Sequence, residues 1–227
     1  MDPNKLRLLV SAKAILVVMA LMLLIPSLSA CNVFFVVVPI SEEHQLSEGC
    51  SASNKGFDKV AYVDKIWESK ILPVVKDKAI DFNTLYGALK SNQDEASKKY
   101  GNQVGGPYNF LTKFEGKVSA VNTTSQAVTI TLETQVGGST VSLSVLIGPV
   151  IFSTALRDAV GIISFNEFVN QLQFADVADE LNTRVYNMSL KGKPFDTLVG
   201  KTVDITGAFT LSVLANLTIM PVYFEIK

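Results

Sequence analysis

Between residues 57 and 101, apolar residues recur every three to four positions, which is the spacing of one face of an α-helix. The first such run consists of Phe57, Val60, Val63, Trp67, Ile71 and Val74. Pro73 is expected to kink or end this helix, because proline removes a backbone donor and clashes with the preceding turn. A second helix is expected to start near Asp81 or Thr84 and to stop at Gly101, a suitable C-terminal cap.

After the turn-forming run Gly105-Gly106-Pro107, apolar and polar residues begin to alternate, as in half-buried β-strands. The predicted strands cover residues 114–121, 127–134, 140–147, 201–211 and 219–226. Helical spacing returns between the third and fourth strands, at about 154–190, with Thr154 as a candidate cap and Ser164 to Glu167 as a capping-box pattern.

This order predicts an α+β fold. We expect a five-stranded OB-like antiparallel β-barrel with a helical insertion between strands three and four, packed with an N-terminal helical layer. A simple sandwich of the same elements is the alternative. The corresponding domains are a helical layer at 57–107 and a barrel domain at 108–227, with its insertion at about 154–190. A fold of this kind does not by itself specify a function.

The N-terminus predicts export. The charged residues Asp2, Lys5, Arg7 and Lys13 precede residues 14–41, where the thiol of Cys31 is the single ionisable group. A basic start followed by an apolar run is typical of a signal peptide. The run contains Leu28-Ser29-Ala30-Cys31, which resembles the bacterial lipobox. The resemblance implies a signal peptide at 1–30, cleavage before Cys31 and a diacylglycerol on its sulfur.

Two other readings of this segment remain open: ordinary secretion, and an uncleaved membrane span, for which about 20 apolar residues suffice. Without lipidation, a disulfide between Cys31 and Cys50 is feasible. Residues 31–56 then comprise the lipid-bearing cysteine and a linker that is rich in Ser, Glu, Asn and Gly from residue 41. The single histidine, His44, is expected to be an exposed linker residue and not a metal ligand.

The net charge of the mature chain limits the classes of binding partner that can be expected. The whole chain has 20 Lys plus Arg and 21 Asp plus Glu, and the leader holds three of the basic and one of the acidic residues, so the mature chain has a net charge of about −3. A general nucleic-acid binder needs a basic surface to displace counterions from phosphates. Small molecules, sugars and proteins remain as partners, together with the membrane.

No catalytic set is expected. A chain with one histidine, no HExxH, no phosphate-cradling glycine loop and no CxxC offers no familiar triad or metal site. Two carboxylate pairs can be nominated for a glycosidase-type hydrolase, Asp158 with Glu167 and Asp176 with Glu180. Solvated or salt-bridged helix faces explain both pairs better. We expect no enzyme, no cofactor and no metal.

The densest polar cluster follows the third strand. Its candidate ligand- or partner-binding residues are Thr154, Arg157, Asp158, Asn166, Asn170 and Gln171. An arginine fork recognises carboxylates or paired hydroxyls, and amide side chains both donate to and accept from sugar hydroxyls. A structural use is also open, in which Arg157 ties a helix to the barrel by bonding backbone carbonyls.

Parts of this region and its surroundings resemble a known family. The matching runs are Ile147-Gly148-Pro149-Val150, Thr154-Ala155-Leu156-Arg157-Asp158, residues 163–168, Asn170-Gln171, Lys98-Lys99-Tyr100-Gly101, Phe114-Glu115-Gly116-Lys117-Val118 and residues 175–182. They are similar to the predicted periplasmic lipoproteins called domain of unknown function 2291. An Arg-Gly pair usually stands where this chain has Phe152-Ser153, so a basic contact at the first position is missing here.

The resemblance implies a role but no activity. Members of the family tend to be encoded beside sugar ABC-transporter components, which implies a non-enzymatic, membrane-anchored, extracytoplasmic lipoprotein that is accessory to carbohydrate transport. The alternative is a module that binds a sugar or small ligand directly on the barrel face. That alternative expects an exposed aromatic ring, from Phe152, Phe165 or Tyr108, beside Arg157 and Asn170.

Overall fold

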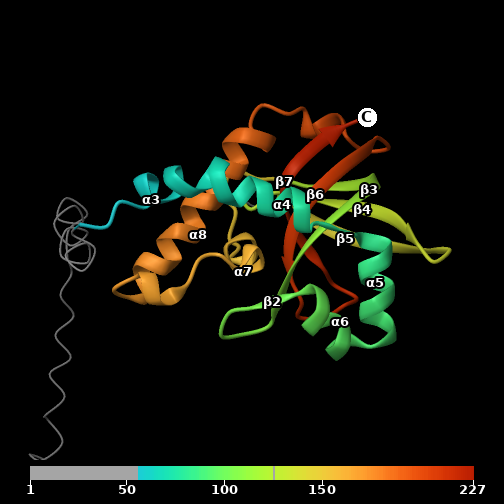
Figure 1. Ribbon diagram of the computed structural model, residues 1–227. Coiled ribbons are helices and arrows are strands. Elements are labelled where there is room, and N and C mark those ends of the chain that lie inside the picture. The colour runs from blue at the N-terminus through green and yellow to red at the C-terminus, as the bar shows by residue number, and fades with distance from the viewer. Residues whose placement is uncertain (1–55, 125) are drawn as a thin grey trace, which may run out of the picture. The chain divides into compact units, whose positions relative to one another are not determined.

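The computed structural model of the chain describes residues 56–124 and 126–227 (Figure 1). The described residues belong to one compact unit. The expected leader, the lipidation site at Cys31, the Cys50 thiol and His44 lie outside the described residues. No helix among the described residues is both long and apolar enough to cross a bilayer.

The first helical segment continues through Pro73. It consists of α3 (Lys59–Ile66), a π-helical turn η4 (Trp67–Ile71) and α4 (Leu72–Lys78). At the end of η4 the amide of Leu72 donates to the carbonyl of Trp67, five residues back. Pro73 therefore falls in the first turn of α4, where a missing amide hydrogen breaks no necessary bond. The helical segment does not end at the proline, because the wider π-helical turn before it accommodates the proline ring and its missing hydrogen bond.

The second predicted helix is two helices, α5 (Phe82–Ser91) and α6 (Gln93–Tyr100). Asn92 separates them. Its backbone is extended, with φ at −150°, and its side-chain oxygen accepts a hydrogen bond from the amide of Glu95 at 3.2 Å. Asparagine is a strong N-terminal cap, so the chain restarts a helix at this point instead of continuing the first one.

Five long strands follow the helices: β3 (Tyr108–Asn122), β4 (Thr129–Val136), β5 (Ser139–Leu146), β6 (Thr202–Thr210) and β7 (Thr218–Ile226). Two short strands, β1 (Ile80–Asp81) and β2 (Asn102–Gln103), pair with β3. The turn between β4 and β5 is Gly137-Gly138, with φ at 56° and 81°. Two consecutive positive φ values are what a tight hairpin turn requires and what glycine adopts without strain.

The five long strands close into a ring. β3 pairs with β4, β4 with β5, β5 with β7, β7 with β6, and β6 with β3. Four of these pairings are antiparallel, but β5 and β7 run parallel over Ser144↔Thr218 and Val145↔Ile219. The expectation of an antiparallel arrangement throughout is corrected here, since a ring with an odd number of strands cannot reverse direction at every junction.

The helices between β5 and β6 begin with α7 (Ala155–Val160). A 3₁₀ turn η5 (Phe165–Glu167), α8 (Gln171–Val185), a π-turn η6 (Tyr186–Leu190) and a second 3₁₀ turn η7 (Phe195–Thr197) complete the set. The capping box at Ser164 and Glu167 is confirmed. Thr154 takes the N-cap position of α7 as expected, but its side chain makes no capping hydrogen bond, and the hydroxyl of Ser153 accepts the amide hydrogen of Ala155.

One hydrophobic core joins the ring to its helices. α7 packs against β3 and β6, α5 packs against β3 and β4, and α3 packs against α8. Phe110 in β3 and Phe209 in β6 stack their aromatic rings with centroids 5.1 Å apart, and both side chains are fully buried. Trp67 is buried as well, as expected for a core residue.

We expect opposite effects from the same substitution at two glycines. A Cβ on Gly207 would lie 2.4 Å from the carbonyl oxygen of Met220, whereas a Cβ on Gly87 would meet nothing within 4 Å. Gly207→Ala should lower the free energy of unfolding by about 1–3 kcal/mol, because the tightly paired strands must move apart. Gly87→Ala, inside α5, should raise it by about 0.5–1 kcal/mol. Urea unfolding followed by the fluorescence of Trp67 measures both, and equal effects at the two sites would contradict the ring packing.

Candidate functional site

The predicted polar cluster divides into a buried part and an exposed part. Arg157 and Asp158 lie in α7 and are only 7% and 6% exposed. Thr154, Asn166 and Gln171 are exposed. The candidate residues, although close in sequence, are therefore divided between the interior and the surface of the protein.

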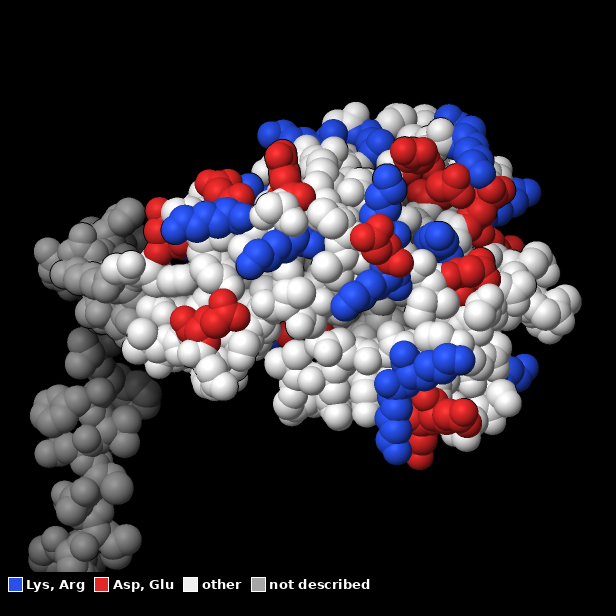
Figure 2. Space-filling model, in the orientation of Figure 1, with Lys and Arg blue, Asp and Glu red and all other residues white. Residues whose placement is uncertain are grey.

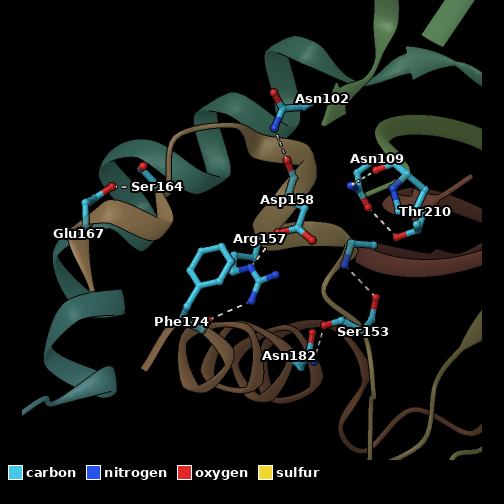
Figure 3. Close-up of polar contacts among 12 residues, drawn as sticks. Asn102, Asn109, Ser153, Arg157, Asp158, Ser164, Glu167, Phe174, Asn182 and Thr210 are labelled. Carbon is cyan, nitrogen blue, oxygen red and sulfur yellow. Dashed lines mark hydrogen bonds and ion pairs between the residues drawn. The ribbon is translucent and has the colours of Figure 1, made fainter. Parts of the chain in front are cut away.

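Arg157 makes both polar and aromatic contacts with groups of the protein (Figure 3). Its Nε donates to Asp158 Oδ1 at 2.8 Å, and its Nη1 donates to the carbonyl oxygen of Phe174 in α8 at 3.0 Å. The guanidinium carbon lies 3.6 Å from the centroid of the Phe174 ring. The flat face and two of the donor groups of Arg157 are thus already occupied, in a cation–π contact and two charge-assisted hydrogen bonds.

Two asparagines clamp the same region from other elements. Asn102 Nδ2 in β2 donates to the carbonyl oxygen of Asp158 at 2.6 Å. Asn182 Nδ2 in α8 donates to the carbonyl oxygens of Ile151 and Ser153, at 3.0 and 2.9 Å, on the segment that leads into α7. α7 is thus tied to β2 on one side and to α8 on the other (Figure 3). The geometry fits the structural role that was open for Arg157.

The remaining candidates have local roles or none. Asn170 caps α8 by accepting the amide hydrogen of Gln173 at 3.0 Å, and its amide-bearing side chain is half-buried. Asn166 donates its backbone amide to the Ser164 hydroxyl at 3.4 Å. Of the expected stacking rings, Phe152 is 80% exposed and Phe165 is 45% exposed, but neither contacts Arg157 in a ring or hydrogen-bond interaction. The pockets described among residues 56–124 and 126–227 are lined by other residues.

The nominated carboxylate pairs are also engaged. Glu180 accepts a hydrogen bond from Arg184 Nε at 2.9 Å, and Asp176 lies 4.0 Å from Lys59 Nζ. Glu167 accepts hydrogen bonds from the amide of Ser164 and from the hydroxyl of Tyr62. Within residues 56–124 and 126–227, no group of three or more His, Cys, Asp or Glu side chains is placed to hold a metal ion.

An open groove lies elsewhere, on the outer face of the ring. It has a volume of about 580 Å³ and is lined by Lys76, Asp81, Lys113, Phe114, Glu115, Asp204, Ile205, Thr206, Tyr223 and Glu225. These residues come from α4, β1, β3, β6 and β7. Figure 2 shows acidic and basic side chains gathered at the end of the molecule where the last strand finishes. We call this surface the charged groove.

The charges of the groove are only partly neutralised. Lys227 Nζ binds Glu115 and lies 2.9 Å from Asp204 Oδ2. Hydrogen bonds to these two carboxylates raise the pKa of Lys227 above its ordinary value, so it stays protonated. Lys76, Lys113 and Glu225 make no ion pair with any residue that the structure describes. Asp81 also makes no ion pair among the described residues, but its carboxylate caps α5, so Lys76, Lys113 and Glu225 are the charges most available to a partner.

The family model for "predicted periplasmic lipoprotein (DUF2291)" matches residues 19–225. The chain belongs to this family. A member is predicted to be extracytoplasmic and held at a membrane by its lipid, although the family description names no activity. No curated protein matches the lipoprotein.

Among solved structures, the lipoprotein is similar to an OB-fold protein from Thermotoga maritima MSB8. The TM-score is 0.60 and the identity is 20%, over 76% of the lipoprotein and 99% of the other chain. At that identity the likeness shows the fold alone. The OB-like strand order expected from the sequence is thus supported, with a closed ring of five strands in a mixed α+β structure.

Arg157→Met should lower the free energy of unfolding of the lipoprotein by about 3–5 kcal/mol, because it leaves the Asp158 carboxylate buried without its partner. The double variant Arg157→Met, Asp158→Leu removes both charges and should recover much of this loss. Lys227→Met breaks an exposed pair and serves as the matched control, with little change in the urea midpoint expected. If the Arg157→Met variant were as stable as the wild type, the structural role of Arg157 would be contradicted.

Proposed function

We propose that the lipoprotein is a non-enzymatic docking protein, anchored through Cys31 and accessory to a carbohydrate ABC-transport system, whose charged groove holds a polypeptide of that system. The observation that carries the proposal is the groove itself, an open surface of about 580 Å³ with unpaired charges of both signs. Membership of a family of predicted periplasmic lipoproteins supports the anchoring.

An open, mixed-charge surface suits a macromolecular partner. Complementary charges steer association and fix the register of two proteins, and they do this best at exposed positions such as Lys76, Lys113 and Glu225. Anchoring the lipoprotein beside a permease raises its effective concentration there without any additional contact. A non-enzymatic role is consistent with the engagement of Arg157 and Asp158 by each other.

Direct binding of a sugar in the same groove is the second candidate. Two aromatic residues, Phe114 and Tyr223, line the groove together with carboxylates and lysines, which is the combination that sugar sites use. A ligand that binds only the folded state raises the melting temperature. A saturable thermal shift with one pentose or hexose, abolished by Tyr223→Ala, would favour this candidate over protein docking.

Reversing the free groove cations should weaken docking. We expect Lys76→Glu with Lys113→Glu to reduce affinity for the transport partner roughly tenfold, since charge complementarity becomes repulsion. In cells the readout is the initial rate of labelled sugar uptake, compared with a strain that lacks the gene. The matched control is Lys90→Glu with Lys98→Glu, two exposed lysines on α5 and α6 that do not line the groove. If the deletion strain took up every sugar at the wild-type rate, the proposed transport role would be contradicted.

The anchor itself is tested by metabolic labelling with an alkyne fatty acid. The wild-type protein should carry the label and have a mass that corresponds to loss of residues 1–30, because a diacylglyceryl cysteine becomes the new N-terminus. Cys31→Ser should abolish the label, whereas Cys50→Ser, the matched control, should retain it. An unlabelled wild-type protein that still begins at Met1 would support the membrane-spanning reading instead.

A further inference from the structure

Four exposed apolar side chains lie on the connection between α7 and α8 and in the first turn of α8. Ile162 is 36% exposed, Phe165 45%, Val169 88% and Leu172 56%. Of the nine large apolar side chains that stand exposed among the described residues, these four fall within eleven consecutive positions. We call them the apolar tip.

The apolar tip stands on a rigid base. Phe168 packs beneath it, with ring centroids 5.5 Å from Phe57, 5.2 Å from Tyr62 and 5.6 Å from Phe174. Phe165 makes an edge contact with Phe174 at 5.5 Å. Packed aromatic pairs of this kind fix the geometry of the backbone that carries them. The exposed side chains are therefore displayed by a preformed surface.

The one charge in the tip segment is internally satisfied. Glu167 is the single ionisable residue between positions 162 and 172. Its Oε1 accepts from the Ser164 amide at 2.8 Å and its Oε2 accepts from the Tyr62 hydroxyl at 3.0 Å. Burial and the neighbouring Glu167 raise the pKa of Tyr62 above its ordinary value, so the phenol keeps its donor hydrogen. A carboxylate with two intramolecular donors needs less water around it, which lowers the cost of placing this surface in an apolar setting.

The chain enters the domain at the apolar tip. Phe57, next to the first described residue, packs against Phe168, and α3 starts beside the turn that leads into α8 (Figure 1). Cys31 lies 26 residues before Phe57. The polar spacer at 41–56 spans at most about 55 Å when fully extended. The described chain therefore begins at the same end at which the apolar side chains are exposed.

We propose that the apolar tip is a membrane-contact surface that inserts into the interfacial region of the bilayer carrying the lipid anchor. The inference rests on the anchoring in the proposed function. An exposed aromatic ring and aliphatic side chains on a nearly uncharged surface partition into the headgroup and acyl boundary, typically to a depth of 5–10 Å. Contact by the tip orients the domain, because the attachment point and the inserted side chains lie at one end.

The test uses the full lipidated chain, reconstituted into phosphatidylcholine vesicles with ordinary or brominated acyl chains. Val169→Trp and Leu172→Trp each place an indole in the tip. Val199→Trp is the matched control, since Val199 is 58% exposed and lies just before β6, outside the apolar tip. The buried Trp67 is common to all variants, so emission is compared with the wild type.

Both tip variants should show a blue-shifted added emission and lose about half of it in brominated vesicles, as expected for an indole at interfacial depth. The Val199→Trp variant should keep a water-like emission that bromine does not quench. Equal emission and equal bromine quenching in the tip and control variants would overturn the proposal. An emission shift that depends on protein density and not on lipid bromination would also overturn it, in favour of a protein partner or a second copy of the chain. The vesicles contain no transport protein, so this failure would leave docking at the charged groove untouched.

Discussion

The pairing of β3 with β6 is the constraint on which the rest of the molecule depends. Nine consecutive residue pairs join the two strands, from Asn109↔Thr210 to Lys117↔Thr202. β3 is long enough to pair with β6 along its first part and with β4 along its last part, and this closes the ring. Bringing together segments so distant in sequence costs loop-closure entropy, which the core beneath the two strands must offset.

The same register builds the charged groove. It sets Glu115 opposite Asp204, and Asp204 lies opposite Glu225 on β7. Like charges in directly opposed positions destabilise a sheet, so the outward face carries a local electrostatic cost. Lys227, which binds both Glu115 and Asp204, offsets part of it. The unpaired cations on the groove wall supply a charge environment that a partner can complete.

Much of the fold could be predicted from periodicity, and the failures have physical causes. The alternation in β4 is visible because one face of the strand is solvated. The first half of β3 was missed because residues 109–112 are all buried, under α7 and other elements, so the sequence shows no alternation there. At Asn92 the chain can either continue one helix or stop and start a second helix with Asn92 as its N-cap. Helix propensity alone does not favour one of these two states clearly.

The candidate site was the least predictable part. Arg157 and Asp158 are conspicuous in sequence, but their burial depends on the position of Phe174, which follows them by 16 or more residues. The charged groove carries no motif at all, because its residues come from segments that only the closed ring brings together. Predicting the groove would require knowing which outward-facing residues of neighbouring strands lie side by side. That depends on the strand register, which the sequence alone does not show.

The apolar tip and the charged groove are connected by one helical element. The segment α3–η4–α4 begins beside Phe57 and Tyr62, which support the tip, and carries Lys76 to the groove wall near its other end. Its 20 residues, Lys59–Lys78, correspond to about 30 Å at helical rise. The proposed membrane-contact surface and the proposed docking surface are therefore placed at opposite ends of this segment. The π-turn in front of Pro73 keeps this segment continuous, so the two surfaces are joined by one helical element instead of two.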